Sequence, residues 1–207
     1  MASLADLRAR IADDLERSDL TGQIEDAVRD AVRRYEGERF WFNEFHRASA
    51  TLSVSNDSIA LAALPVVPIE IDRVRVRSGG GPLSEVTHRD SALLLELQDA
   101  EAVARPTSWT IHADALRFDC RADRSYEVLI DGVHKLSTAS AAADVSPWFN
   151  DARDLVRSAA KKQLYLHLVK DAEQAAACAA AEAEALAMLR AKTNARKATG
   201  MLRPTIF

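Results

Sequence analysis

One stretch at residues 23–45, QIEDAVRDAVRRYEGERFWFNEF, organises the rest of this chain. The apolar residues in its first half recur at steps of three and four: Ile24, Ala27, Val28, Ala31, Val32 and Tyr35. This spacing predicts an amphipathic helix with one apolar side. Gly37 then offers a place for the helix to end.

An aromatic cluster follows that glycine, in the sequence Arg39-Phe40-Trp41-Phe42-Asn43-Glu44 with Phe45 behind it. Each buried ring removes roughly 150–250 Å² from water, so we expect the cluster to form a core corner between two domains. A partner-binding patch is the alternative, and mixed local charges disfavour a nucleic-acid stacking platform. On the core interpretation, Trp41→Ala destabilises the fold by roughly 3–5 kcal/mol.

Three further helices are predicted outside the region of alternating pattern. Residues 4–15 form the first, which pairs with the helix of 23–35 in an antiparallel hairpin, and Asp19 or Thr21 caps the second helix. Ser146-Pro147-Trp148 is a helix start, with Ser146 as N-cap and Pro147 at the first helical position, and the helix runs to about Lys170. Asp171 caps a last, alanine-rich helix that ends near Arg190. Its alanine face packs within the chain or against a copy of itself.

Between these helices the apolar pattern alternates, which is typical of strands. We expect a hairpin of 50–54 with 59–63, a strand at 69–76 with a bulge at Asp72-Arg73, and a short strand at 83–86. A small helix at 87–99, starting at Thr87, precedes strands at 108–111, 115–118 and 126–130. The last strand ends in a turn at Asp131-Gly132.

The predicted fold class is α+β: an α-helical bundle with an inserted, mostly antiparallel β domain and an extended C-terminal tail. The boundaries are 1–46 for the N-terminal helical hairpin, 47–135 for the β domain with one short helix, 136–192 for the C-terminal helices that complete the bundle, and 193–207 for the tail. The tail is basic and then apolar, with Arg196, Lys197, Arg203, Met201, Leu202, Ile206 and Phe207. Apolar side chains at a terminus predict docking on another subunit.

The composition of the chain excludes several classes of function. The chain has 207 residues and a net charge of −4, which argues against a general nucleic-acid binder. No run reaches the roughly 18–20 apolar residues of a membrane span, and the acid-bearing N-terminus is unlike a signal peptide. Two distant cysteines do not make a disulfide framework or zinc site. We therefore expect a soluble protein made in a reducing cytoplasm.

No motif for catalysis, cofactor binding or metal binding stands out. Gly79-Gly80-Gly81 lacks the Lys-Ser/Thr of a P-loop, and the five histidines have no metal-ligand spacing. Glu44 and Asp131 are isolated candidates for acid–base work, which keeps a cell-wall hydrolase open as an alternative. A DNA-packaging accessory factor that uses Arg196, Lys197 and Arg203 is a further alternative.

The order of these features resembles the head-to-tail adaptor (head-completion or connector) proteins of tailed bacteriophages. The most specific part is Tyr35-x-x-x-Arg-Phe-Trp-Phe-Asn-Glu. Leu64-Pro65 before a strand, the strand start Pro106 to Ile111, and Trp148 at the opening of a long helix follow in the family's order. The plain alanine run around Cys178, and the lack of a tyrosine near Asp131, depart from the family's pattern.

The resemblance implies a structural virion protein without enzyme activity or cofactor. It would form a ring of about twelve copies under the portal protein at the head–tail junction, with a heterologous interface between copies. The ring would extend the DNA channel, through which genome DNA passes without sequence recognition, and would give tail or nozzle proteins an attachment surface. The C-terminal tail would reach onto the portal. No membrane is involved.

Overall fold

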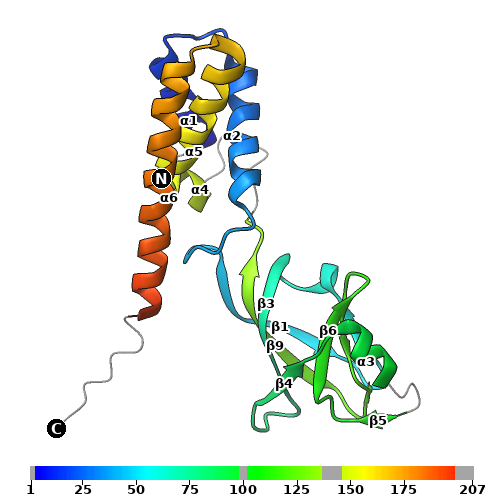
Figure 1. The fold of residues 1–207 in the computed structure, drawn as a ribbon. Helices are drawn as coiled ribbons and strands as arrows, with labels where there is room; N and C mark the ends of the chain where they lie inside the picture. The colour runs from blue at the N-terminus through cyan, green and yellow to red at the C-terminus, as the bar shows by residue number, and fades with distance from the viewer. Residues whose placement is uncertain (1–2, 98–101, 137–145, 199–207) are drawn as a thin grey trace, which may run out of the picture. The chain divides into compact units, whose positions relative to one another are not determined.

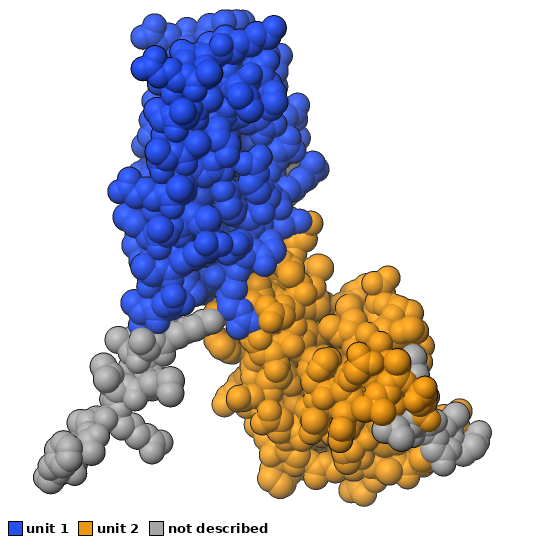
Figure 2. Space-filling view, in the orientation of Figure 1, with its two compact units in different colours: residues 1–42, 136–207 blue, residues 43–135 orange. Residues whose placement is uncertain are grey.

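The structure is a computed structural model that describes residues 3–97, 102–136 and 146–198 (Figure 1). The chain divides into two compact units, coloured separately in Figure 2. Residues 1–42 and 136–207 make one, which we call the helical unit. Residues 43–135 make the other, the β unit. The fold is mixed α and β, as the sequence predicts.

The helical unit is built around α5 (Arg153–Leu164), which contacts α1 (Leu4–Leu15), α2 (Thr21–Tyr35) and α6 (Ala172–Ala198). Its core includes Leu7, Ile11, Ile24, Leu155 and Leu164, all with almost no exposed surface. All six apolar residues predicted to line one side of α2 are buried. The amphipathic pattern therefore predicts this helix and its buried side correctly.

The helix predicted from Trp148 to Lys170 is interrupted. A short α4 (Pro147–Asn150) ends at Asp151-Ala152, where Ala152 leaves helical geometry with φ −108° and ψ 18°. Beyond α5, a π-helical turn, η2 (Tyr165–Val169), ends at Lys170 in the left-handed region. Asp171 caps the next helix as predicted, because its Oδ1 accepts a hydrogen bond from the Gln174 N–H at 3.0 Å.

Two other helix predictions need correction. The residue before α2 is Leu20, whose side chain makes no cap, so neither Asp19 nor Thr21 caps this helix. Helix α6 continues to Ala198 and takes in residues 193–198 of the predicted extended tail. The buried Thr193 hydroxyl donates to the Leu189 carbonyl, and alanines at 191, 195 and 198 favour the helix.

The β unit holds a seven-stranded sheet in the order β1-β9-β3-β4-β6-β7-β2, antiparallel except between β4 and β6. A second, two-stranded parallel sheet pairs β5 with β8. The large sheet comprises β1 (Glu44–Leu52), β2 (Ser58–Ala60), β3 (Pro68–Arg77), β4 (Ser84–His88), β6 (Ser108–His112), β7 (Ala115–Phe118) and β9 (Tyr126–His134). The remaining elements are β5 (Val103–Ala104), β8 (Arg121–Ala122), η1 (Leu61–Ala63) and α3 (Ser91–Leu97).

The pairing of these strands differs from the sequence prediction. No hairpin joins 50–54 to 59–63, because β1 pairs with β9 and β2 pairs with β7. Thr87 and His88 belong to β4, and the small helix begins after Asp90, whose Oδ1 accepts from the Ala92 N–H. The bulge predicted in β3 is confirmed by a register shift between Ile71 and Arg73.

Asp131-Gly132 is not a turn but part of β9, the central partner of β1 and β3. Gly132 lies opposite Phe45 on one side and Ile71 on the other. A Cβ atom at this position would lie 2.1 Å from the Glu70 carbonyl oxygen. Glycine is therefore required because the β3 backbone approaches too closely for any side chain.

Candidate functional site

We searched the residues that the structure describes for a metal site, a membrane-spanning helix and a reactive cysteine. Within it, no group of three His, Cys, Asp or Glu side chains could hold a metal ion. No described helix is long and apolar enough to cross a membrane. Cys120 and Cys178 are free and buried, and burial raises the pKa of Cys120 to about 11. Both thiols are poor nucleophiles at neutral pH.

Asp131, one of the two candidate acids, is held by other groups. Its carboxylate accepts from the Arg75 guanidinium at 2.7 Å and from the Arg47 backbone N–H at 2.8 Å. Arg47 has a φ of 57° and lies at the register shift between Phe45 and Ala48 in β1. Asp131 therefore stabilises a strained bulge. Glu44, the other candidate, is the first residue of β1 and lies opposite Val133.

The aromatic motif supplies a ring cluster within the helical unit. Phe40 is fully buried and stacks on Phe42 with centroids 5.3 Å apart. Both rings meet the indole of Trp148 edge-on, at 5.9 and 5.3 Å. Ser146 caps α4 through its hydroxyl, which accepts from the Trp148 N–H, and Pro147 is the first helical residue. The predicted helix start and the aromatic motif thus meet in one core.

Trp41 does not hold the buried position that the sequence suggests. It is partly exposed, packs edge-on against Phe42, and carries the Arg196 guanidinium 4.6 Å from its ring centroid. The fully buried rings are those of Phe40 and Trp148. A large loss of stability is therefore expected for Trp148→Ala, and a smaller one for Trp41→Ala.

The motif's other members have separate places. Arg39 is half-buried in the helical unit, before the boundary between the units at Phe42 and Asn43. Asn43 opens the β unit with 1% of its surface exposed, and its carbonyl accepts from the His134 N–H at 2.9 Å.

Glu182 joins three helices, a role that the sequence analysis did not identify. Its buried carboxylate accepts from the Tyr35 hydroxyl at 2.6 Å and from the side chains of Arg34 and Lys162. Burial is the largest influence on its pKa and raises it, but hydrogen bonds from Lys162 and Tyr35 outweigh burial and lower the pKa. Burial and the bond to Glu182 raise the pKa of Tyr35 to about 12.

A signal for this role was present in the sequence. Glu182 falls in register with the buried residues of α6 at 175, 178, 185 and 189, at steps of three and four. A carboxylate on that stripe has to face the bundle. Arg34 and Lys162 supply the positive charges that a buried carboxylate requires.

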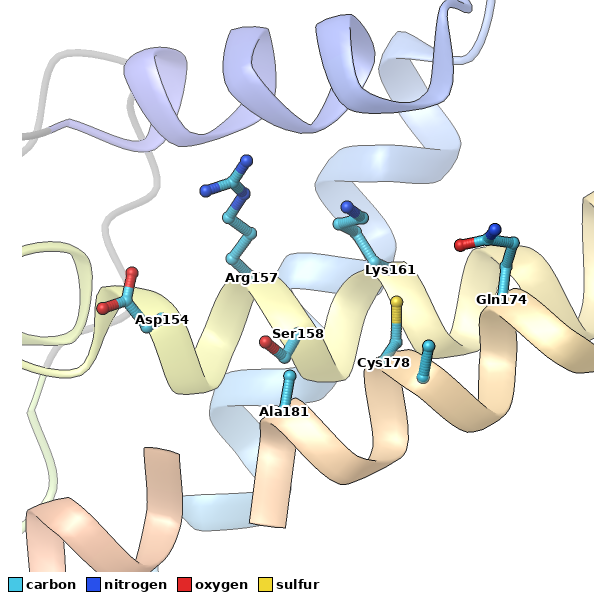
Figure 3. A pocket seen from close by; sticks show the side chains of 8 residues that line it. Asp154, Arg157, Ser158, Lys161, Gln174, Cys178 and Ala181 are labelled. Atoms are coloured by element: carbon cyan, nitrogen blue, oxygen red, sulfur yellow. The ribbon is translucent and has the colours of Figure 1, made fainter. Parts of the chain in front are cut away.

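A groove between α5 and α6 holds about 440 Å³ (Figure 3). Ser158 and Ala177, Cys178 and Ala181 line its small-residue side. Arg157 and Lys161 line it too, but their side chains point toward α1, where both bind Asp14, at 2.6 and 3.1 Å. These two cations are therefore engaged within the helical unit.

The outer side of α6 is unusually rich in exposed alanine. The exposed residues from Ala176 to Ala183 are all alanines. The exposed Glu184 follows them, and Ala187 and Met188, with 51% of its area exposed, add apolar surface beyond it. Exposed helix faces normally carry charges, and a helix that is apolar all round is normally buried. We call the exposed alanines that do not line the groove, Ala176, Ala180 and Ala183, the outer alanine face.

Two of the predicted tail residues, Arg196 and Lys197, belong to α6. Arg196 lies on Trp41. Met201, Leu202, Arg203, Ile206 and Phe207 lie outside the described residues.

Comparison with known proteins decides the family. The model of the SU10 adaptor protein family matches residues 2–205, nearly the whole chain. The chain belongs to the SU10 adaptor protein family. The resemblance to phage adaptors is thereby confirmed, and a SU10 adaptor has a structural role in which it binds other virion proteins. No curated protein matches the chain.

Proposed function

We propose that this SU10 adaptor assembles into a ring of about twelve copies beneath the portal protein, at the head–tail junction of the virion. The ring extends the DNA channel and provides the attachment surface for tail or nozzle proteins. The protein catalyses no reaction in this role and requires no cofactor. The family match supports the adaptor role, and the outer alanine face carries the proposal of a ring.

The outer alanine face suits contact between copies because its exposed side chains are small and apolar. Alanine side chains let the backbone of a neighbouring helix approach closely, as small residues do at other helix–helix contacts. From Ala176 to Ala183 the exposed positions carry no charge whose hydration would be lost on contact. In a ring the interface is heterologous, so this face meets a different surface of the next copy.

The C-terminal tail is proposed to bind the portal. Arg196 and Lys197 lie near the end of α6, and Met201, Leu202, Arg203, Ile206 and Phe207 come after it in the sequence. An apolar segment that orders on binding can cover a large surface on a partner. We predict that a chain lacking residues 201–207 folds normally but no longer binds the portal. Unchanged binding would contradict this role.

DNA is proposed to pass through the channel without being read. A net charge of −4 fits this passage, because a wall that bound phosphates strongly would oppose movement of the genome. Neither alternative function gains support from a specific contact. Asp131 is occupied by Arg75 and the Arg47 N–H, and Arg196 lies on Trp41.

Native mass spectrometry of the protein, alone and with the portal protein of the same phage, tests the proposal. We expect a complex in which a defined number of copies, about twelve, loads onto one portal ring. Absence of a complex while the portal ring stays intact would contradict the adaptor ring. Peptidoglycan zymography and a salt-dependent gel shift would then test the hydrolase and the DNA-packaging alternatives.

A further inference from the structure

Three arginines of the β unit line one pocket of about 280 Å³: Arg77 at the end of β3, Arg105 after β5, and Arg124 before β9. They come from segments far apart in the sequence. The β unit as a whole is acidic, with ten Arg and Lys against fourteen Asp and Glu. A gathering of positive charge in this unit is therefore a local feature, and it marks the pocket as a candidate site for an anion.

The acids near the pocket compensate only part of this charge. Arg77 binds Glu127 at 2.5 Å through Nε, and Arg124 binds Asp123 at 3.0 Å. Asp123 is the one carboxylate that lines the pocket, and its other oxygen accepts from the Tyr126 hydroxyl at 2.7 Å. Among the described residues Arg105 has no ion pair. The lining residues thus carry three positive charges and one negative.

The carboxylates also fix the arginines in place. Arg124 gives Nε and Nη2 to Asp123, and Arg77 gives Nε to Glu127, so each retains further N–H donors. The hydrogen bond from Tyr126 is the largest influence on the pKa of Asp123 and lowers it, so Asp123 stays ionised. Ser78 adds a hydroxyl to the lining. The donors of Arg77 and Arg124 are held by these carboxylates before any ligand arrives, which reduces the entropy cost of binding.

We propose that this pocket binds an Asp or Glu side chain presented by another protein of the virion. The planar fork of arginine matches a carboxylate with two parallel hydrogen bonds. The arginines converge on one small pocket and do not form a row that could follow successive phosphates, and the acidic β unit repels a polyanion such as DNA. That the carboxylate belongs to a virion protein rests on the proposed adaptor function. The anion site itself rests on the pocket.

The site is tested by NMR on the isolated, full-length chain, through the Nε–H signals of its arginines. The probes are N-acetylglutamate methylamide, which has one side-chain carboxylate, and inorganic phosphate, each at constant ionic strength against sodium chloride. We expect the carboxylate probe to give saturable shifts for Arg77, Arg105 and Arg124. Arg105→Gln should weaken its affinity roughly tenfold, since a charge-assisted pair is lost.

Two variants serve as comparisons. Arg105→Lys keeps the charge but loses the fork, and we expect an affinity between those of the natural chain and Arg105→Gln. Arg121→Gln removes another exposed arginine of the β unit that does not line the pocket, and we expect no change. Because Arg105 is exposed, the rest of the spectrum should keep its native pattern in each variant.

Three results would overturn the proposal. Shifts no larger than those caused by sodium chloride would show that the pocket is not an anion site. Saturation by phosphate alone would assign the pocket to a phosphate ligand instead of a protein carboxylate. An equal effect of Arg121→Gln would show that general charge, not the pocket, binds the probe. The measurement needs no portal and no ring, so its failure and that of the proposed ring are distinguishable.

Discussion

The helical unit and the β unit use charged residues in different ways. In the helical unit, carboxylates lie between helices: Glu182 joins α6 to α2 and α5, and Asp14 joins α1 to α5. In the β unit the ion pairs run between neighbouring strands, as Arg75 with Asp131 and Arg77 with Glu127. The first arrangement fixes how helices pack, and the second fixes which strands pair.

The units also differ in where they leave charge and apolar surface uncovered. In the helical unit, Asp14 pairs with Arg157 and Lys161, the two cations that line the groove, whereas the outer alanine face is exposed. The β unit buries its sheet core but leaves a pocket of arginines only partly compensated. The difference indicates two kinds of contact, an apolar one for the helical unit and a polar one for the β unit.

Gly132→Ala is expected to have the largest effect on stability. It should destabilise the β unit and leave the helical unit unchanged. The new Cβ atom would meet backbone on β3, which cannot rotate away, so we expect the β unit to lose about 4–5 kcal/mol or more. Hydrogen exchange read by mass spectrometry should show rapid exchange across β1, β3 and β9, with the helical unit still protected. Equal loss of protection in both units would contradict an effect confined to the β unit.

Gly22→Ala is the matched control for that change. Gly22 lies in α2 with nothing within 4 Å of a Cβ atom. Alanine there should stabilise the helical unit by about 0.5–1 kcal/mol, since glycine costs more conformational entropy in a helix. A destabilising result would show that the glycine has a role that its open surroundings do not explain.

Trp148→Ala is expected to have the next largest effect, confined to the helical unit. Removal of this fully buried ring, which contacts Phe40 and Phe42, should cost about 3–5 kcal/mol. Trp41→Ala, at a partly exposed ring, should cost about 1–2 kcal/mol. Urea unfolding of both variants measures the difference. Equal losses would mean that Trp41 is as important to the core as Trp148.

Glu182→Gln is expected to cost the helical unit about 1–3 kcal/mol, because Lys162 and Arg34 remain partly exposed and can be hydrated. Folding lowers the pKa of Glu182 below its ordinary value of 4.5. Its stabilisation is therefore full above about pH 4.5 and is lost as the pH falls through the lower pKa of the folded state. In urea unfolding from pH 7 downward, the free energy of unfolding should fall less for Glu182→Gln than for the natural chain. An identical fall in both would contradict the role of Glu182.

Sequence periodicity predicts the helices better than the strand pairing, for a physical reason. The apolar side of α2 depends on fifteen consecutive residues. Strand β1, by contrast, pairs with β9, and the contact between Arg47 and Asp131 joins residues 84 positions apart. Pairing over such distances is not specified by local alternation. For the same reason Asp131-Gly132 looks like a turn in sequence, although it is the middle of a paired strand.

The candidate surfaces were predictable only in part. The alanine-rich helix and its face are visible in sequence, because they depend on one continuous segment. The break at Ala152 and the π-helical turn at 165–169 depend on packing and left no pattern in the sequence. The arginine pocket also escaped prediction, since Arg77, Arg105 and Arg124 meet only after β3, β5 and β9 take their places.

The most direct test of the ring places a charge on the outer alanine face. Ala180→Glu lies at an exposed position within it, so the isolated chain should fold as before. Ala9→Glu, at an exposed alanine of α1, is the control. In native mass spectrometry with the portal, Ala9→Glu should load a complete ring and Ala180→Glu should not, because the new charge would be buried without a partner. A complete ring with Ala180→Glu would contradict assembly through this face.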